Sequence, residues 1–320
     1  MSEKVIVTGA AGFIGSHLCE ALLDDGHEVV GIDCFTSNYD VLIKKRNISG
    51  LRGNDRFKLI EASLTDMNLA AAVEDADYVF HQAAQPGVRD SWHERFDEYV
   101  DANIRATHRL CEACRGGGVK RFLYAGSSSV YGETAQLPMA ESHPTRPLSP
   151  YGVTKLSGEA LCLLYRQNYG LPVVSLRYFT VFGPRQRADM AFHKFIKNAL
   201  CGRPIEIYGN GTQTRDFTFV SDIVRANLLA MTYDGAETVF NIGGGSRITL
   251  NGVLDVLLDA LPEKSEVRYA DAVKGDVSHT YADISLAAGQ LGYAPKASLE
   301  ESIHLEVEWI RSLHGAVPGY

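Results

Sequence analysis

The stretch Lys4-Val5-Ile6-Val7-Thr8-Gly9-Ala10-Ala11-Gly12-Phe13-Ile14-Gly15 decides the fold. Residues 4–8 form a largely apolar run that predicts a buried strand, and the glycine-spaced turn after it predicts the start of a helix. Gly9 permits the tight turn, Gly12 lets the backbone approach a pyrophosphate, and Gly15 lets helix and strand pack closely. The free N–H groups of the helix N-terminus would face those phosphates. The stretch therefore predicts the first βα unit of a dinucleotide-binding fold.

A second short run, Glu28-Val29-Val30-Gly31-Ile32, ends at Asp33. A carboxylate at about this distance past the glycine turn can accept hydrogen bonds from an adenosine ribose. The same carboxylate would repel a phosphate on the 2′ position of that ribose. Asp33 therefore predicts NAD, and not NADP, as the cofactor.

Short β-branched runs alternate with helical patterns through the first half of the chain. This alternation is typical of an α/β fold, a doubly wound parallel sheet of the Rossmann type with helices on both faces. Ligands of such sheets bind at the carboxyl ends of the strands, where Asp33, the turn 81–84 and Ser127 would all fall. The predicted strands are 4–8, 28–32, 57–60, 77–81, 121–126 and 172–177.

After Gly183 the pattern changes to glycine and proline punctuation between short strands. We expect an NAD-binding Rossmann domain over residues 1–180, to which segments near 222–243 return. Residues 181–320 would mainly form a smaller mixed domain for the substrate. A chain of 320 residues is long for one compact core, which agrees with two domains.

Composition excludes several classes of function. Hydrophobic residues make up 45% and charged residues 22%, which is ordinary for a globular protein, and the net charge of −8 offers no general attraction to nucleic acid. No apolar run is long enough to cross a bilayer, and the first residues enter a strand without a signal-peptide pattern, so we expect a cytoplasmic protein. The six cysteines form no metal-ligand array, and buried packing explains Cys111-x-x-Cys114 better than zinc or redox chemistry does. No metal site is expected.

Tyr151 and Lys155 carry the clearest chemical signal, because residues four apart project from the same face of a helix. A nearby ammonium favours phenolate over phenol, so Lys155 is expected to lower the pKa of Tyr151 far enough for it to accept a proton from a sugar hydroxyl. A surface Tyr–Lys pair with no catalytic role shows the same spacing. The glycine turn in the same chain favours the catalytic interpretation.

A set of motifs occurs along the chain in a fixed order: Gly9-x-x-Gly12-x-x-Gly15, Asp33, Ser127-Ser128-Ser129-Val130-Tyr131-Gly132, Tyr151-x-x-x-Lys155, Arg177-Tyr178-Phe179-Thr180-Val181-Phe182-Gly183-Pro184-Arg185, Arg215-Asp216-Phe217 and Tyr281-Ala282-Asp283-Ile284. In this order and spacing they resemble the extended short-chain dehydrogenase/reductase family. The resemblance is strongest to its NAD-dependent nucleotide-sugar epimerase and dehydratase branch, and it covers nearly the whole chain. The segments after 84 and after 179 look most like UDP-glucuronate 4-epimerases.

The resemblance implies a role for each of these positions. Tyr151 would be the catalytic base, Lys155 would hold the nicotinamide ribose, and Ser127 would pass or steady the proton. Cofactor-binding residues would be Gly9, Gly12, Phe13, Ile14, Gly15, Asp33, Ser63, Leu64, Gln82, Ala83, Ala84, Asn103, Tyr151, Lys155 and Tyr178. Substrate-binding residues would be Arg89, Ser127, Ser128, Ser129, Thr180, Arg185, Arg187, Arg215 and Asp276.

Some of these roles have ordinary structural alternatives. Asn103 can be a buried amide bonded to the main chain, and Tyr178 can be a packed core aromatic. An exposed arginine is usually a solvated charge, although Arg215 resembles the family arginine that binds a nucleotide pyrophosphate. Ser63 stands where many relatives carry an adenine-binding aspartate, so its hydroxyl would bind the adenine more weakly.

Two departures from the family pattern narrow the substrate. The dehydratases carry an acid–base Asp-Glu pair where this chain has Ser128 and Ser129, so elimination of water lacks its catalysts. Thr180 replaces the asparagine of the glucose epimerases. Small hydroxyls at these positions could hold a C6 carboxylate by charge-assisted hydrogen bonds. Fixing the carboxylate off the ring's π-axis would protect a 4-keto uronate from losing carbon dioxide.

We therefore hypothesise reversible C4 epimerisation of UDP-glucuronate to UDP-galacturonate through a 4-keto intermediate, with tightly held NAD. Alternatives are a UDP-glucose or UDP-N-acetylglucosamine 4-epimerase, a UDP-glucuronate decarboxylase, or a non-catalytic dinucleotide-binding sensor. A homodimer is a family expectation, formed through helices at 97–115 and 152–169. Neither nucleic acid nor a membrane is expected as a partner.

Overall fold

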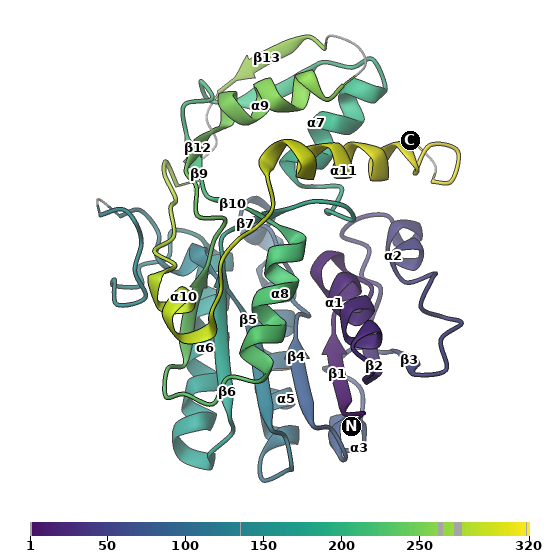
Figure 1. Cartoon of the computed structure of the whole chain (residues 1–320), viewed down its shortest axis with the longest axis vertical. Helices are drawn as coiled ribbons and strands as arrows, with labels where there is room; N and C mark the ends of the chain where they lie inside the picture. Colours follow the sequence, from purple (N-terminus) through teal and green to yellow (C-terminus); the bar gives the residue numbers. More distant parts are fainter. Residues whose placement is uncertain (1, 135, 262–264, 272–276, 318) are drawn as a thin grey trace.

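A seven-stranded sheet, in which every neighbouring pair of strands is parallel, forms the centre of the molecule (Figure 1). The computed structural model describes residues 2–134, 136–261, 265–271, 277–317 and 319–320. The strand order is β11-β6-β5-β4-β1-β2-β3. The strands are β1 (Lys4–Thr8), β2 (Glu28–Asp33), β3 (Phe57–Glu61), β4 (Tyr78–His81), β5 (Arg121–Ser127), β6 (Val173–Tyr178) and β11 (Val239–Ile242).

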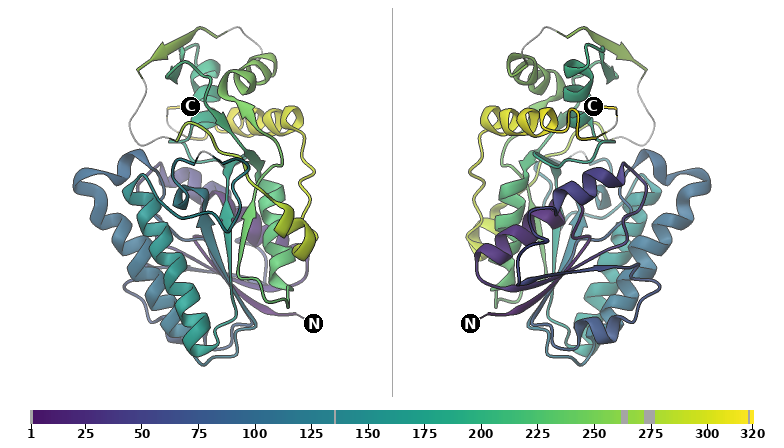
Figure 2. Two further views of the ribbon diagram at one scale, coloured as in Figure 1. Left: turned by 90° about the vertical axis from the view of Figure 1, so that its left-hand side faces the viewer. Right: turned by 90° about the vertical axis from the view of Figure 1, so that its right-hand side faces the viewer.

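Helices cover both faces of the sheet, as Figure 2 shows with the strands seen between two helix layers. Alternation along β1 explains the two layers, because Val5 and Val7 pack into one core and Ile6 packs into the other. The first core includes α1 (Phe13–Asp24) and α8 (Val220–Met231). The second includes α3 (Leu69–Val73), α5 (Ala106–Cys114) and α6 (Pro150–Tyr169). The predicted doubly wound Rossmann-type sheet is confirmed.

Helix α6 brings Tyr151 and Lys155 to the sheet, and its sequence fixes both of its ends. The Ser149 hydroxyl accepts a hydrogen bond from the Gly152 amide at 3.1 Å, and Pro150 occupies the first turn. Gly170, with φ of 71°, stops the helix in the left-handed conformation. The N-terminal cap therefore sets the orientation of the turn that carries Tyr151.

The neighbouring helical region differs from the single helix expected over 97–115. It consists of α4 (Phe96–Tyr99), the π-helical turn η3 (Val100–Arg105) and α5. A π-helical turn holds one more residue than an α-helical turn, so it shifts the residues around it. Here it contains Asn103, which is fully buried.

A second group of elements lies beyond the carboxyl ends of the strands (Figure 1). It includes α7 (Ala191–Leu200), the parallel pair β8 (Ile205–Tyr208) and β13 (Val267–Ala270), α9 (Leu250–Asp259) and α11 (Leu299–Arg311). Helix α10 (Ser285–Leu291) packs instead against β11 and α8. The expected division of the chain near residue 180 stays a prediction. The remaining elements are α2 (Val41–Asn47), η1 (Arg89–Ser91), η2 (His93–Arg95), η4 (Ser128–Val130), β7 (Thr180–Phe182), β9 (Thr214–Arg215), β10 (Phe217–Phe219) and β12 (Ile248–Thr249).

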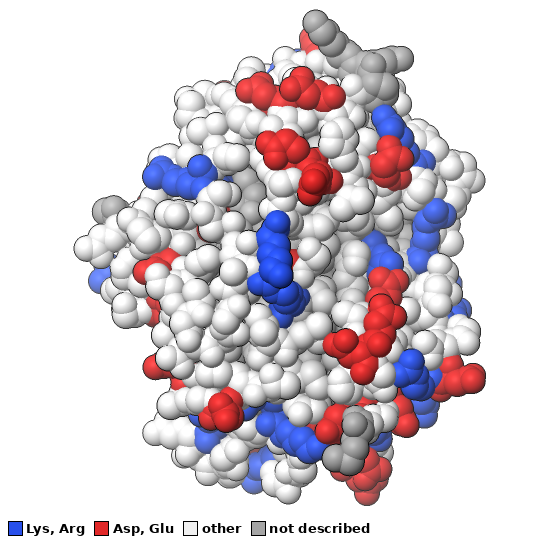
Figure 3. Space-filling model, viewed as in Figure 1, with Lys and Arg blue, Asp and Glu red and all other residues white. Residues whose placement is uncertain are grey.

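Charged side chains of both signs are interspersed over the face shown in Figure 3. Among the helices of the described residues, none is long and apolar enough to cross a membrane. Within the same residues, no cluster of His, Cys, Asp and Glu could hold a metal ion. Cys111 and Cys114 lie on α5 and are buried in the core against which this helix packs, which agrees with a packing role.

Candidate active site

A cavity of about 1080 Å³ opens at the carboxyl ends of the strands, between the sheet and the group of elements beyond it. This is the edge at which the sequence placed the ligand. The cavity is lined by most of the predicted site residues: Gly9, Gly12, Phe13, Ile14, Gly15, Asp33, Ser63, Leu64, Gln82, Ala83, Ala84, Arg89, Ser127, Ser128, Ser129, Tyr151, Lys155, Tyr178, Thr180 and Arg187.

The glycine turn has the geometry that a dinucleotide pyrophosphate requires. Gly9 adopts a φ of 70°, and a Cβ added there would lie 2.8 Å from the Ala83 amide nitrogen. A Cβ on Gly15 would lie 2.1 Å from the Gly9 carbonyl oxygen. Helix α1 begins after Gly12, and no side chain of the described residues caps it. Its first amides are therefore available to phosphate oxygens.

Asp33 is held where an adenosine ribose could reach it. One of its carboxylate oxygens accepts a hydrogen bond from the Ala11 amide at 3.0 Å, and the other accepts one from the Phe35 amide at 2.8 Å. Each oxygen keeps a second lone pair for a ligand hydroxyl. Ser63 lines the same part of the cavity, and its hydroxyl lies 2.7 Å from that of Thr65. These residues fit an NAD adenosine.

Ser127 and Tyr151 meet at the centre of the cavity. Ser127 ends β5, and Tyr151 lies in the first turn of α6. Burial raises the pKa of the Tyr151 phenol, while a hydrogen bond from Ser127 and the positive charge of Arg187 lower it. The prediction that Lys155 brings the pKa of Tyr151 below its usual value is wrong for the chain by itself. The loss of solvation raises this pKa by more than Ser127 and Arg187 lower it.

Lys155 lies one helical turn beyond Tyr151 and is buried. Burial lowers the pKa of its ammonium to about 8. Its Nζ lies 4.5 Å from the centre of the Tyr124 ring, so a cation–π contact partly replaces the lost hydration. Lys155 is thus a partly desolvated cation in the same cavity as the phenol. Such a group can hold ribose hydroxyls and stabilise a phenolate once ligands bind.

Tyr178 and Asn103 combine binding and packing roles. The Tyr178 hydroxyl donates to the Asn227 side-chain oxygen at 3.0 Å and accepts from Gln82 at 3.1 Å, and burial raises its pKa to about 12. Asn103 does not line the cavity. Its amide instead makes two hydrogen bonds to the Gln85 backbone, at 2.7 and 3.0 Å. It therefore supports the backbone of the cavity wall.

The predicted arginines separate into two groups. Arg89 and Arg187 line the cavity, and Arg89 stacks 4.5 Å from the centre of the Tyr208 ring. Neither Arg185 nor Arg215 is among the described residues that line it. Arg185 points to α1, and Arg215 donates to backbone carbonyls. Asp276 lies outside the described residues.

The sequence interpretation missed several residues of this site. Asp189 binds Arg187 through two hydrogen bonds, at 2.7 and 3.0 Å, and the resulting ion pair lines the cavity. The spacing Arg187-x-Asp189 was visible in the sequence. Tyr99 is also buried, with its ring centre 6.3 Å from that of Tyr151, but no local pattern links them. Nor did any pattern predict Asn227 as the partner of Tyr178.

Comparisons with known proteins agree with this geometry. Residues 5–243 match the model of the NAD dependent epimerase/dehydratase family. The Bacillus subtilis protein YtcB, described as an uncharacterized UDP-glucose epimerase, is 46% identical over 314 residues, covering 97% of this chain and 99% of YtcB. The UDP-glucuronate 4-epimerase of Thermodesulfobacterium geofontis is 37% identical over 308 residues, covering 95% of each chain.

Solved structures show the same similarity. The crystal structure of UDP-glucuronic acid 4-epimerase from Bacillus cereus, in complex with UDP-glucuronic acid and NAD, superposes with a TM-score of 0.93. The two sequences are 43% identical, and the match covers 97% of this chain and 99% of the other. The family resemblance predicted from the motifs is thereby confirmed. This chain belongs to the NAD-dependent epimerase/dehydratase family.

Proposed function

We propose that the protein catalyses the reversible C4 epimerisation of UDP-glucuronate to UDP-galacturonate, through a 4-keto intermediate and with bound NAD. The observation that carries the proposal is the pair of Ser127 and Tyr151, joined by a hydrogen bond in a cavity that the glycine turn and Lys155 also line. The similarity to epimerases crystallised with UDP-glucuronic acid and NAD supports it.

Each residue of the pair has one task. Tyr151 accepts the proton of the C4 hydroxyl as C4 is oxidised, and it returns a proton when C4 is reduced. Ser127 donates a hydrogen bond to the phenolic oxygen and lowers the pKa of Tyr151, which burial alone would raise. Lys155 favours the phenolate and holds the cofactor ribose. When bound, NAD would accept a hydride from C4 and give it back to the ketone from the other face of the sugar.

The substrate's carboxylate would be held by hydroxyls and one cation. Ser128, Ser129, Thr180 and Arg187 all line the cavity. Charge-assisted hydrogen bonds from such groups are short and directional, so they can fix a carboxylate off the ring's π-axis. We infer that this fixation protects the 4-keto uronate from decarboxylation while the sugar turns over in the cavity.

The proposal is tested by incubating the purified protein with UDP-glucuronate and no added cofactor. UDP-galacturonate is the expected product, formed until the two sugars reach equilibrium. Exclusive formation of a UDP-pentose would replace the epimerase by a decarboxylase. If the purified protein contains bound NAD but converts no substrate, a sensor that binds the dinucleotide without turnover would be favoured.

A second candidate is a 4-epimerase of neutral UDP-glucose or UDP-N-acetylglucosamine, which the description of the relative YtcB favours. Arg187 is already paired with Asp189, so the cavity does not demand an anionic sugar. The ratio of kcat/KM for UDP-glucuronate to that for each neutral sugar separates the candidates. A ratio below one would overturn the proposal that UDP-glucuronate is the preferred substrate.

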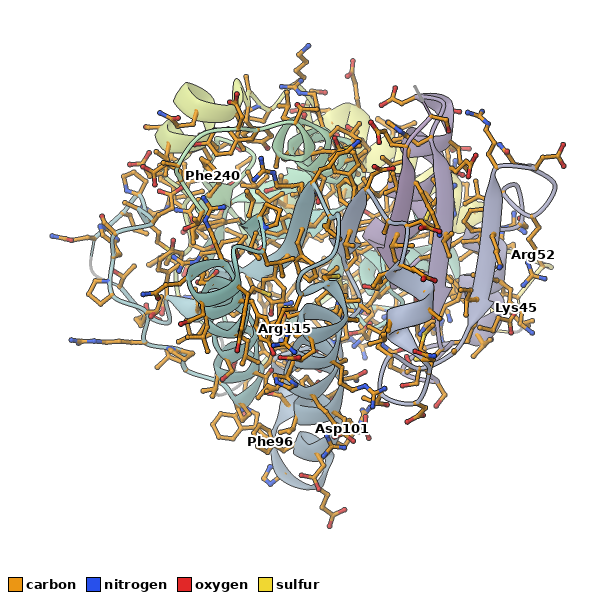
Figure 4. The ribbon with its side chains drawn as sticks, turned by 90° about the horizontal axis from the view of Figure 1, so that it is seen from below. Lys45, Arg52, Phe96, Asp101, Arg115 and Phe240 are labelled. Carbon is orange, nitrogen blue, oxygen red and sulfur yellow. The ribbon has the colours of Figure 1, made fainter. Side chains whose placement is uncertain are left out.

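The proposal extends to organisation and location. Residues 1–180, with returning segments near 222–243, would form the NAD-binding domain, and most of 181–320 would form the nucleotide-sugar domain. The protein would act as a cytoplasmic homodimer. Apolar side chains exposed on α6 and α4 support a dimer, and Phe96 lies at the outer edge of this helix layer (Figure 4). They are Phe96, Val153, Leu164 and Tyr169.

A further inference from the structure

Among the described residues, Arg185 is one of two predicted substrate residues that do not line the cavity. Its guanidinium pairs with the Glu20 carboxylate of α1 at 2.6 Å, and only 17% of its side chain is exposed. Its backbone has a φ of 69°, a left-handed conformation that is unfavourable for a residue with a side chain. Contacts with neighbouring residues must hold Arg185 in this conformation, so these contacts show what fixes the loop around it.

The loop of residues 183–187 is fastened at several points. The Gly183 amide donates to the buried Glu306 carboxylate of α11 at 2.9 Å. The Pro184 carbonyl accepts a hydrogen bond from the His17 ring at 2.9 Å. Gln186 bonds to the Val181 carbonyl at 3.1 Å. Arg187 then emerges from this fixed backbone into the cavity.

His17 and Glu20 lie three positions apart on α1 and so face the same side of the helix. Burial and the nearby Arg185 lower the pKa of His17 to about 4, so its ring is neutral and donates from Nε2 to the carbonyl. The N-terminus of the same helix faces the cavity through Phe13 and Ile14. One rigid helix therefore contacts both the dinucleotide end of the site and the loop that presents Arg187.

We propose that Arg185 is a positioning residue, which fastens the Arg187 loop to the dinucleotide-binding helix through Glu20 and so aligns the UDP-sugar site with the cofactor. This inference rests on the proposed function in one respect, namely that a UDP-sugar contacts Arg187. By linkage, occupancy of the dinucleotide site then improves sugar binding, and the sugar improves retention of NAD by the same factor.

A charge exchange tests the inference. Glu20→Arg and Arg185→Glu each place two like charges together, and each is expected to raise KM about tenfold while kcat stays within threefold. The double variant E20R/R185E restores opposite charges and is expected to bring KM back to within threefold of the parent. Reversal of the exposed Glu308–Arg311 pair of α11, 2.5 Å apart, is the control and should leave KM unchanged.

The split between KM and kcat distinguishes positioning from a loss of folded protein, which would lower kcat and leave KM alone. An unchanged KM in both single variants, or a double variant no better than the worse single one, would overturn the inference. If a reversed variant does not fold, Glu20→Gln provides the answer, with KM expected to rise about threefold and an unchanged KM counting against the role.

The measurements use UDP-glucuronate and UDP-glucose in parallel, together with the NAD content of each preparation. A parent enzyme that converts only UDP-glucose contradicts the proposed function. The charge-exchange variants are then compared with the parent by their KM for UDP-glucose. The two proposals therefore fail separately.

Discussion

At the scale of single residues, the chemistry depends on a phenol in an environment that opposes its ionisation. Burial raises the pKa of Tyr151, and the hydrogen bond from Ser127 and the charge of Arg187 partly offset that effect. The sequence showed that Tyr151 and Lys155 share a helix face, but it could not show the loss of solvation, which depends on how the whole cavity closes around them.

Tyr151→Phe removes the proposed base and leaves the ring in place. General base catalysis contributes a factor of roughly 10² to 10⁴, so kcat should fall by about that factor. KM should change by less than about threefold, because the sugar and nucleotide contacts are kept. Steady-state kinetics on UDP-glucuronate measure both constants. A variant that matches the parent's turnover would refute the role of the phenol.

Lys155 makes stability depend on pH in a defined direction. Its pKa is lowered from 10.5 to about 8, so between these values the unfolded chain binds more protons than the native one, and stability from this group rises with pH. Lys155→Met removes a cost of up to about 3 kcal/mol at pH 7, equal to the shift multiplied by 1.36 kcal/mol per unit.

The variant K155M should therefore melt at a higher temperature than the parent at pH 7, and this difference should shrink as the pH approaches 10. Its turnover should fall more than a hundredfold, because the phenolate and the ribose both lose their cation. Lys58→Met, at an exposed position in β3, is the matched control. A stability difference that is the same at both pH values would contradict the buried, partly desolvated ammonium.

At the scale of elements, the strands were predicted well and the helices around the site less well. Short β-branched runs identified the six strands expected up to residue 177, with each end within one residue of the observed one, because central strands of a parallel sheet are apolar on both faces. The run 97–115 reads as one helix, yet η3 interrupts it. Asn103 donates a hydrogen bond to the Gln85 carbonyl and accepts one from the Gln85 amide, which joins that turn to a distant loop, and no local pattern encodes such a contact.

The same dependence on contacts between distant residues explains which site residues could be predicted from the sequence. Positions in the glycine turn and at strand ends were predicted correctly to lie at the cavity, since the topology alone brings carboxyl ends together. The direction of Arg185 was not predictable, because it depends on Glu20, which is distant in sequence. A motif thus locates a loop, while packing against other elements decides which of its side chains face the ligand.

The cap of α6 is expected to serve both stability and catalysis. Ser149→Ala removes the hydrogen bond to the Gly152 amide and should cost about 1 kcal/mol of unfolding free energy. Because Tyr151 lies in that first turn, kcat should also fall severalfold. Ser298→Ala, at the cap of α11, is a matched control that should lose similar stability at unchanged kcat. Equal kcat values for the two variants would show that the α6 cap does not orient the phenol.

At the scale of the whole molecule, the parallel sheet and the elements beyond its carboxyl edge line one cavity, which in the proposed function holds the dinucleotide and the sugar together. The layer of α5 and α6 lies on the other side of the sheet from α1 and α8. A dimer formed through α6 would therefore leave the proposed link between Arg185 and Glu20 inside each subunit.

Leu164→Asp tests the proposed dimer. Leu164 lies on α6 with 52% of its area exposed, and a charge there should be excluded from an apolar interface. We expect light scattering to give about 70 kDa for the parent, which is twice the chain mass of 35.0 kDa, and the mass of a monomer for the variant. Leu305→Asp, at an equally exposed leucine on α11, should remain a dimer. A parent that is monomeric would remove the dimer from the proposal.

The central claim is that C4 is oxidised and reduced again within one site. UDP-glucuronate labelled with deuterium at C4 tests it most directly, because the isotope leaves C4 and returns to the opposite face without exchanging with water. Proton NMR should show UDP-galacturonate that retains the deuterium at C4. Product that carries hydrogen from solvent at C4, or no inversion at that carbon, would contradict the account.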